Sequence, residues 1–359
     1  NCVRESDTVS RLGGDEFTVI LTELEDTLRV EHIAEKILHS LSQPFALGME
    51  RVYISASIGI ALYPNDTEEI SELVINADQA MYLAKANGRD QFSFFTQSMQ
   101  LGAQYRHQLV NDLHNALIEE QFQLHYQPII NLQTGKIIKA EALLRWNHPM
   151  RGQINPEEFI PLAEESGFII DIGHWVFQQS VQQIKRWQEK FASDFQVSIN
   201  KSSIQFRAQE DHSDWLAYLK QHKVSGRHLI IEITENLLLD DSGKVNNQLS
   251  FFRENGIQIA LDDFGTGFSA LSNFNKFDID YLKIDKTFIQ KLSADSNDRP
   301  LCESIIVMAH KLGLKVIAEG IETNEQQQIL MDANCDYGQG FLFSKAIPAD
   351  AFEKLLFHD

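Results

Sequence analysis

The alternation of short apolar strands with amphipathic helices after Phe122 most limits how this chain can fold. The candidate strands are Phe122–Ile130, Ile137–Trp146, Phe195–Asn200, Leu229–Thr234, Gln258–Asp263, Tyr281–Asp285, Lys315–Glu319 and Tyr337–Phe343. Helical patterns fill most of the gaps, including Pro156–Ser166, Trp175–Phe191, Leu237–Asn255 and Leu301–Leu312. Strands and helices alternating in one domain of this length predict a (β/α)-barrel, with an open doubly wound sheet as the alternative.

A second, smaller α/β domain precedes the barrel. Its candidate strands are Thr8–Arg11, Phe17–Leu21 and Val52–Ala61, with two helical patterns between and after them. We expect residues 1–97 to form this domain, 98–118 a helical linker and 119–359 the barrel. The apolar stripe along the linker helix is typical of a connector that packs on one neighbouring domain, but it also fits a signalling helix that transmits rotation between the two domains. Because the chain begins so close to a strand, we expect the first domain to lack its own beginning.

Charge and cysteine usage exclude several classes of function. A net charge of −20 argues against binding of DNA or RNA polymers or of anionic membranes, and a phosphate-bearing substrate would need metal ions to offset the repulsion. Three dispersed cysteines support neither a disulfide framework nor a zinc ribbon. No apolar run approaches the ~20 residues that span a bilayer. We therefore expect the chain to be cytoplasmic. In the full-length parent, a missing N-terminal segment could tether the protein to the inner face of the membrane.

Polar residues recur where the barrel strands end. Asp262 and Asp263 are adjacent carboxylates before a glycine-hinged loop, and such neighbours usually need a cation to coexist in a desolvated pocket. Active sites of (β/α)-barrels gather at the carboxyl ends of the strands. The residues that converge there are Glu141, Asn200, Glu232, Asp262, Asp263, Lys283, Glu319 and Gln339.

Each of these residues also has an ordinary structural interpretation. Glu232 alone fits a salt-bridged strand residue. Lys283 has a potential ion-pair partner in Asp285 on the same strand face, and Asn200 could cap the following helix. The joint occurrence of oxygen and ammonium groups at one end of one domain favours a functional site.

Oxygen ligands without histidine or cysteine select hard cations such as Mg²⁺ or Mn²⁺. Asp262 could bridge two ions, and paired metals ~3.5 to 4 Å apart suit phosphodiester hydrolysis by an activated water. Arg145, four residues after Glu141 on the same strand face, could hold a phosphate through forked hydrogen bonds. The residues alone therefore predict metal-dependent hydrolysis of a phosphoryl ester.

The segment Glu141-Ala142-Leu143-Leu144-Arg145-Trp146 resembles the EAL motif that names a family of cyclic di-GMP phosphodiesterases. Further motifs that share this resemblance are Ile231–Glu235, Asp262–Gly267, Leu282–Asp285, Ala318–Glu322 and Gln339–Phe341. The resemblance extends from about Tyr126 to the C-terminus. It implies a TIM-like (β/α)8 barrel, a homodimer and hydrolysis of cyclic di-GMP to linear pGpG.

The resemblance also implies roles for single residues. It makes Glu141, Asn200, Glu232 and Asp262 ligands of one metal, with Asp262, Asp263 and Glu319 serving a second. Lys283 would contact the attacking water and act with Glu141 and Glu319 in catalysis. Substrate contacts would come from Gln127, Leu143, Arg145, Asp285 and Gln339. Glu235 would brace the loop Asp263–Ser269, and the departures Lys201 and Ala346 touch no ligand position.

The first domain resembles the second half of a GGDEF domain, the diguanylate cyclase module. Its hairpin motif comprises Gly13, Gly14, Asp15, Glu16 and Phe17, whose paired glycines permit a tight turn. The segment Ala80–Arg89 resembles the phosphate-side helix, with Lys85 as the expected contact, and Arg4 and Asp7 occupy the positions of a possible inhibitory site. The resemblance places another metal-binding Asp upstream of residue 1, so we expect no cyclic di-GMP synthesis from this part.

Two rival functions stay open at this point. A catalytically silent receptor would bind cyclic di-GMP without turnover, although such receptors typically lose metal ligands or the loop-bracing Glu. A bifunctional cyclase/phosphodiesterase is possible for the full-length parent, whose GGDEF domain could bind GTP or cyclic di-GMP.

Overall fold

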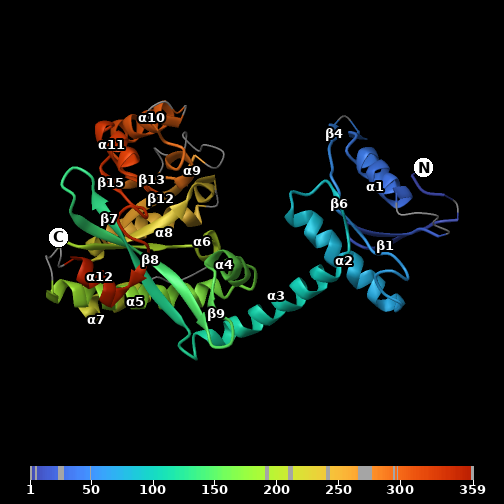
Figure 1. Ribbon diagram of the computed structural model, residues 1–359, viewed down its shortest axis with the longest axis horizontal. Helices are drawn as coiled ribbons and strands as arrows, with labels where there is room; N and C mark the ends of the chain where they lie inside the picture. Colours follow the sequence, from blue (N-terminus) through green and yellow to red (C-terminus); the bar gives the residue numbers. More distant parts are fainter. Residues whose placement is uncertain are drawn as a thin grey trace. The chain divides into compact units, whose positions relative to one another are not determined.

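The computed structural model describes residues 2–4, 6–22, 28–48, 50–190, 194–208, 213–239, 243–265, 277–293, 296 and 298–356. The chain divides into two compact units, Asn1–Gln108 and Leu109–Asp359 (Figure 1). Helix α3 (Gln97–Ala116) contributes residues to both units. The finer division into residues 1–97, 98–118 and 119–359 stays a prediction.

In its described residues, the first unit contains short strand pairs and two helices besides the first part of α3. Its elements are β1 (Thr8–Gly13), β2 (Glu16–Ile20), α1 (Leu28–Leu41), β3 (Phe45–Leu47), β4 (Glu50–Val52), β5 (Ile58–Ile60), α2 (Ile70–Ala86) and β6 (Phe92–Phe94). The expectation of one strand over Val52–Ala61 was wrong. Val52 ends β4, residues 53–57 are not in a strand, and β5 begins at Ile58; β4 pairs with β3, whereas β5 pairs in parallel with β6.

The second unit is a closed barrel. Its strands, as the described residues give them, are β7 (Phe122–Asn131), β8 (Ile137–His148), β10 (Gln196–Asn200), β11 (Leu229–Thr234), β12 (Gln258–Phe264), β13 (Tyr281–Ile284), β14 (Lys315–Ala318) and β15 (Tyr337–Gly338). Each pairs with the next, and β7 closes the ring because it pairs with both β8 and β15. The barrel prediction is therefore confirmed, and the open sheet is excluded.

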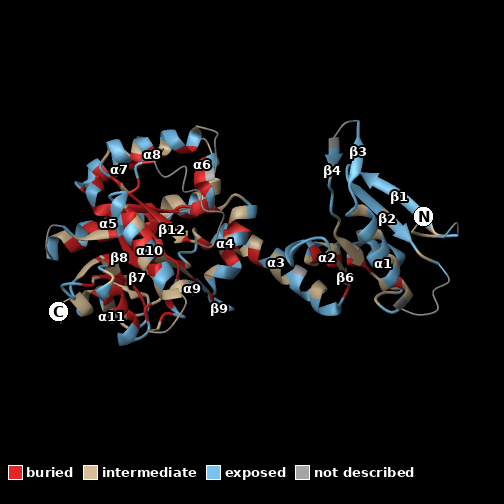
Figure 2. Ribbon diagram, turned by 90° about the horizontal axis from the view of Figure 1, so that it is seen from above, coloured by how far each residue is buried: buried red, intermediate tan, exposed pale blue. Residues whose placement is uncertain are grey.

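Helices surround this barrel. They are α4 (Pro156–Glu165), α5 (Ile169–Lys190), α6 (Ser203–Arg207), α7 (Ser213–His222), α8 (Lys244–Glu254), α9 (Lys286–Ile289), α10 (Asp298–Lys311), α11 (Asn324–Asp332) and α12 (Ala349–Leu356). Figure 2 shows the buried residues concentrated in the barrel strands, whereas β1 and β2 are largely exposed. Side chains of Ser202 and Thr323 form capping boxes that begin α6 and α11. Within the described ranges, no helix has the length and apolar character needed to cross a membrane.

Two predicted elements of the barrel differ from the expectation. The pattern Leu237–Asn255 is interrupted, because a 3₁₀ helix η2 (Glu235–Leu239) precedes α8, and Gly243 adopts a φ of 73° just before α8. The strand expected over Tyr337–Phe343 ends at Gly338. Beyond it the chain turns against Ile321, whose carbonyl oxygen would lie 2.1 Å from a Cβ at Gly340.

The first barrel strand runs antiparallel to its neighbours. The connection from β7 to β8 is a short turn in which the Asn131 side chain accepts a 2.9 Å hydrogen bond from the Thr134 backbone N–H, and Gly135 has a φ of 71°. Such a turn is too short for the helical crossover that parallel strands need. As a result, the beginning of β7 lies beside the carboxyl end of β8, and Gln127 is opposite Glu141.

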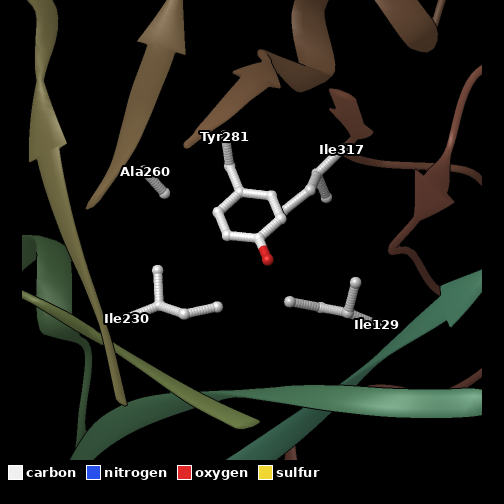
Figure 3. Close-up of a cluster of buried hydrophobic side chains, with 5 residues drawn as sticks. All are labelled: Ile129, Ile230, Ala260, Tyr281 and Ile317. Carbon is white, nitrogen blue, oxygen red and sulfur yellow. The ribbon is translucent and has the colours of Figure 1, made fainter. Parts of the chain in front are cut away.

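An apolar layer fills the barrel below the strand ends. It contains Ile129, Ile230, Ala260, Tyr281 and Ile317, with the Tyr281 ring in the middle (Figure 3). Lys139 enters this layer: its ammonium donates to the Tyr281 hydroxyl at 3.0 Å and to the Gln196 side chain, and lies 4.6 Å from the Tyr281 ring centre. Burial lowers the pKa of Lys139 to about 8, although Asp280 opposes the shift. We call this layer the barrel floor.

The buried Lys139 predicts a pH dependence of barrel stability. Because the pKa of Lys139 is lower in the folded state than in the unfolded state, the unfolded chain binds more protons between pH 8 and pH 10.5. The free energy of unfolding therefore rises as the pH increases from about 8 toward 10.5. Relative to Lys139→Met, the wild-type chain should gain about 2 kcal/mol between pH 7 and pH 10.

Urea unfolding followed by tryptophan fluorescence measures this gain for the barrel alone, because all four tryptophans lie in the second unit. Exposed Lys136→Met is the matched control. If the difference in the free energy of unfolding between wild type and Lys139→Met stayed constant with pH, the assigned burial of the Lys139 charge would be contradicted.

Candidate active site

The next layer of side chains above the floor is polar. Alternate residues of a strand face the same side of the sheet. Two positions after the floor residues Ile230, Ala260 and Ile317, the strands therefore present Glu232, Asp262 and Glu319, respectively. The same step from Lys139, Ser198, Tyr281 and Tyr337 leads to Glu141, Asn200, Lys283 and Gln339. The strand pattern thus places the sequence-predicted polar residues in one layer, over an apolar base.

Lys283 is the centre of this layer. Among the described residues its ammonium pairs with four carboxylates: Glu232 at 2.7 Å, Glu319 at 2.7 Å, Asp262 at 3.1 Å and Glu141 at 3.6 Å. The Lys283 side chain is 1% exposed. Burial opposes its charge, but these carboxylates outweigh burial and raise the pKa of Lys283 well above its usual value. The alternative of a simple Lys283–Asp285 pair is wrong, because Asp285 instead caps α9 through the Thr287 N–H.

Two amides orient Glu141. Asn200 Nδ2 donates to one carboxylate oxygen at 2.8 Å, and Gln339 Nε2 donates to the other at 2.7 Å. Gln339 also donates to Gln127 at 3.0 Å, and Gln127 donates to the Ser344 carbonyl at 3.1 Å. Burial disfavours the Glu141 charge, but Lys283 and the two amides lower its pKa below the usual value. Asn200 therefore does not cap the next helix, which Ser202 caps instead.

A second group of carboxylates lies beside Lys283. Asp262, Asp263 and Glu319 each offer an oxygen within 4.8 Å of the others, an arrangement that could hold a metal ion. Asp263 has a φ of 55°, which is unusual for a residue other than glycine, and its backbone N–H contacts Asp262 Oδ1 at 3.0 Å. This left-handed turn of the backbone lets two consecutive residues present carboxylates to one place.

The charge of the site is not balanced by Lys283 alone. Burial, together with the charges of Glu141 and Asp262, raises the pKa of Glu232 well above its usual value, while burial raises that of Glu319 to about 8. Glu232 Oε1 is buried and has no hydrogen-bond partner in the described part of the chain. Excess carboxylates and an unpaired acceptor oxygen are what a site for a hard divalent cation requires. The donor set fits Mg²⁺ or Mn²⁺.

The expected substrate contacts lie around the layer. Leu143 and Arg145 follow Glu141 on the same face of β8, and the half-buried Arg145 donates to the Leu144 carbonyl at 2.9 Å. Glu235 accepts a 3.3 Å hydrogen bond from the Gly265 N–H, at the start of the loop that it was expected to brace. Residues 266–269 of that loop lie outside the described residues. The Ser344 carbonyl was missed, since a backbone acceptor leaves no signal in the sequence.

The GGDEF-like residues lie in the first unit, each on the expected kind of element. Gly13 ends β1 and pairs with Glu16, and Gly14, which has a φ of 51°, begins the turn to β2. Asp15 completes the turn, Glu16 begins β2, and both are exposed; the Phe17 ring centre lies 5.9 Å from the Arg11 guanidinium. Lys85 is exposed in the last turn of α2, while Asp7 accepts a 2.7 Å hydrogen bond from the Arg4 backbone N–H. Their proposed nucleotide contacts stay predictions.

Comparison with known families confirms the resemblance seen in the sequence. The family model of the EAL domain matches residues 110–346. The family model described as diguanylate cyclase, GGDEF domain, matches residues 1–91. The barrel and the hairpin unit thus correspond to two distinct families.

Individual relatives agree with these matches. The bifunctional diguanylate cyclase/cyclic di-GMP phosphodiesterase MucR of Pseudomonas aeruginosa is 41% identical over 348 residues, which are 97% of this chain and 51% of MucR. The cyclic di-GMP phosphodiesterase NbdA of the same organism is 34% identical over 354 residues, covering 99% of this chain and 45% of NbdA. A solved structure of the PaMucR phosphodiesterase in complex with c-di-GMP has a TM-score of 0.65 and 38% identity, over 68% of this chain and 99% of that one. The chain spans about half the length of the curated relatives it matches.

The central lysine predicts a strong dependence of stability on its charge. In Lys283→Met the buried carboxylates lose their common cation, so the free energy of unfolding in the presence of EDTA should fall by about 3–5 kcal/mol. Exposed Lys311→Met should change it by less than about 0.5 kcal/mol. Urea unfolding followed by tryptophan fluorescence measures both variants, and an unchanged midpoint for Lys283→Met would contradict the ion pairs described.

Proposed function

Because this chain belongs to the EAL domain family, we propose that it is a phosphodiesterase that hydrolyses cyclic di-GMP to linear pGpG. The observation that carries the proposal is the layer of carboxylates around Lys283 at the strand ends, in which the expected metal-ligand positions are all occupied by oxygen donors. Two curated relatives are named as enzymes of this activity, and a similar barrel is described with c-di-GMP bound. The silent-receptor alternative is not favoured, because the ligand set and Glu235 are present.

We assign the metal ligands as two overlapping groups. Glu141, Asn200, Glu232 and Asp262 would hold one Mg²⁺ or Mn²⁺, and Asp262, Asp263 and Glu319 would hold a second. When bound, such ions offset phosphate charge and make water a stronger nucleophile. The amides of Asn200 and Gln339 fix the carboxylate plane of Glu141 and thereby keep one ligand in place.

The remaining residues position water and substrate. Lys283 would donate a hydrogen bond to the attacking water while Glu141 and Glu319 keep its ammonium in the site. Arg145 would hold a phosphate by two parallel hydrogen bonds, with further substrate contacts from Gln127, Leu143, Asp285 and Gln339. Glu235 would transmit the position of the loop after Asp263 to the metal ligands.

The wider context of the activity belongs to the same proposal. We place the reaction in the cytoplasm. All three cysteines lie among the described residues and are free thiols rather than disulfides, as is usual for proteins of a reducing compartment. A homodimer, and GTP or cyclic di-GMP at the GGDEF domain of the full-length protein, follow from the family resemblance.

Removal of Glu141 tests the proposed metal site. Glu141→Ala should lower the rate of pGpG formation by about a hundredfold or more. Loss of a residue that only supports a metal ligand typically costs ~10–100-fold, and loss of a ligand itself should cost at least as much. It should also weaken Mn²⁺ binding measured by calorimetry, a readout independent of turnover. Exposed Glu254→Ala is the matched control. Full activity in Glu141→Ala would refute the ligand assignment, while wild-type binding of cyclic di-GMP without turnover under Mg²⁺ or Mn²⁺ would make the protein a receptor.

Removal of Arg145 tests the proposed phosphate contact. Arg145→Ala should raise the KM for cyclic di-GMP about tenfold, the effect of losing a hydrogen bond from a charged donor, and should leave Mn²⁺ affinity unchanged. Chromatographic rate measurements across substrate concentrations give KM, with exposed Arg227→Ala as control. An unchanged KM would remove Arg145 from the substrate site.

A further inference from the structure

His125 lies on the face of β7 that belongs to the active site. In the antiparallel pairing of β7 with β8, His125 is opposite Leu143, and the next pair on this face is Gln127 with Glu141. Residues directly opposite each other on paired strands project to the same side of the sheet. His125 is therefore one step above the layer of carboxylates, beside the proposed substrate residues Leu143 and Arg145. The sequence motifs assign it no role.

The strands on both sides of His125 place apolar side chains next to it. On one side is Leu143 of β8, and on the other is Pro348 of β16 (Ile347–Pro348), which pairs antiparallel with β7. Neither side chain can form a hydrogen bond, and a proline also lacks a backbone N–H. The half-buried imidazole thus has apolar neighbours at its flanks, and its nitrogens need other partners.

In the described part of the chain, the backbone of Ala346 is the hydrogen-bond partner of the imidazole. Burial lowers the pKa of His125, the bond to Ala346 opposes the shift, and the nearby Arg145 charge adds to it, so the ring is neutral at neutral pH. Because the bond to Ala346 favours the charged ring, the imidazole is its donor. A neutral imidazole that donates from one nitrogen accepts through the other. His125 therefore offers an acceptor nitrogen close to Arg145.

A further contact follows from the proposed function, in which Arg145 holds a phosphate of cyclic di-GMP. We propose that His125 is a substrate-binding residue whose imidazole accepts a hydrogen bond from the ribose 2′-hydroxyl next to that phosphate. An acceptor nitrogen repels the phosphate oxygens and needs an N–H or O–H donor. In a 3′,5′-linked cyclic dinucleotide, the 2′-hydroxyl is on the carbon next to an esterified carbon, whereas the N–H groups of the base lie farther from the phosphate.

The spacing of the two side chains agrees with this assignment. His125 and Arg145 are diagonal neighbours across β7 and β8, and the Cβ atoms of such neighbours are about 7–8 Å apart or less. Side chains at this separation can reach two adjacent groups of one nucleotide. The contact makes the site selective for ribose over deoxyribose, because a substrate without the hydroxyl leaves the acceptor nitrogen unpaired.

Hydrolysis of cyclic di-GMP and of its analogue with hydrogen in place of both 2′-hydroxyls tests the contact. The wild-type chain should have a kcat/KM about fivefold to tenfold higher for the ribose substrate, the effect of one hydrogen bond. His125→Phe keeps a ring but removes the acceptor, so it should lower kcat/KM for cyclic di-GMP by this factor and leave that for the analogue unchanged. Its Mn²⁺ affinity, measured by calorimetry, should equal that of wild type. Exposed His39→Phe is the control and should keep the wild-type preference.

The ratio of the two kcat/KM values distinguishes a substrate contact from a structural role. A structural His125 would lower both values alike in His125→Phe, and an unchanged ratio would overturn the proposal. Equal kcat/KM of the wild-type chain for both substrates would overturn it too, and this result does not depend on the folding of a variant. Those two results leave the phosphodiesterase function intact, whereas hydrolysis of neither substrate under Mg²⁺ or Mn²⁺ would refute the proposed function together with the contact.

Discussion

The ion pairs of Lys283 are the interaction on which the active-site layer depends. One ammonium cannot neutralise Glu141, Glu232, Asp262 and Glu319 together, and burial, aided by the neighbouring carboxylates, raises the pKa of Glu232 and Glu319. Burying several like charges costs far more than a surface pair. The fold bears this cost within a rigid barrel, where strand pairing on both sides holds each carboxylate. Such a preorganised excess of negative charge is suited to binding divalent cations rather than to stability.

Barrel closure determines which residues meet in this layer. The antiparallel β7 brings Gln127 opposite Glu141, and Gln339, which directly follows β15, donates hydrogen bonds to both. The floor below, with Tyr281 and Ile317, places buried, mostly apolar side chains beneath the carboxylates.

Much of this arrangement follows from strand periodicity. The alternation of strands and helices predicted the barrel, and the polar residues near the strand ends, such as Glu232 and Asp262, predicted that these side chains converge. The direction of β7 was not predicted, although the short segment between Asn131 and Lys136 leaves no room for a crossover helix. The four partners of Lys283 could not be predicted either. Sequence spacing favoured Asp285, whereas pairing across strands joins residues up to 142 positions apart.

The central claim is that the carboxylate layer is a two-metal site. Its most direct test is a crystal structure of the chain grown with Mn²⁺, with anomalous scattering used to locate the metal. We expect two anomalous peaks, one bounded by Glu141, Asn200, Glu232 and Asp262 and the other by Asp262, Asp263 and Glu319. Lys283 should then exchange part of its carboxylate contacts for water. A map with no peak in this layer, and with Lys283 still paired to all four carboxylates, would contradict the account.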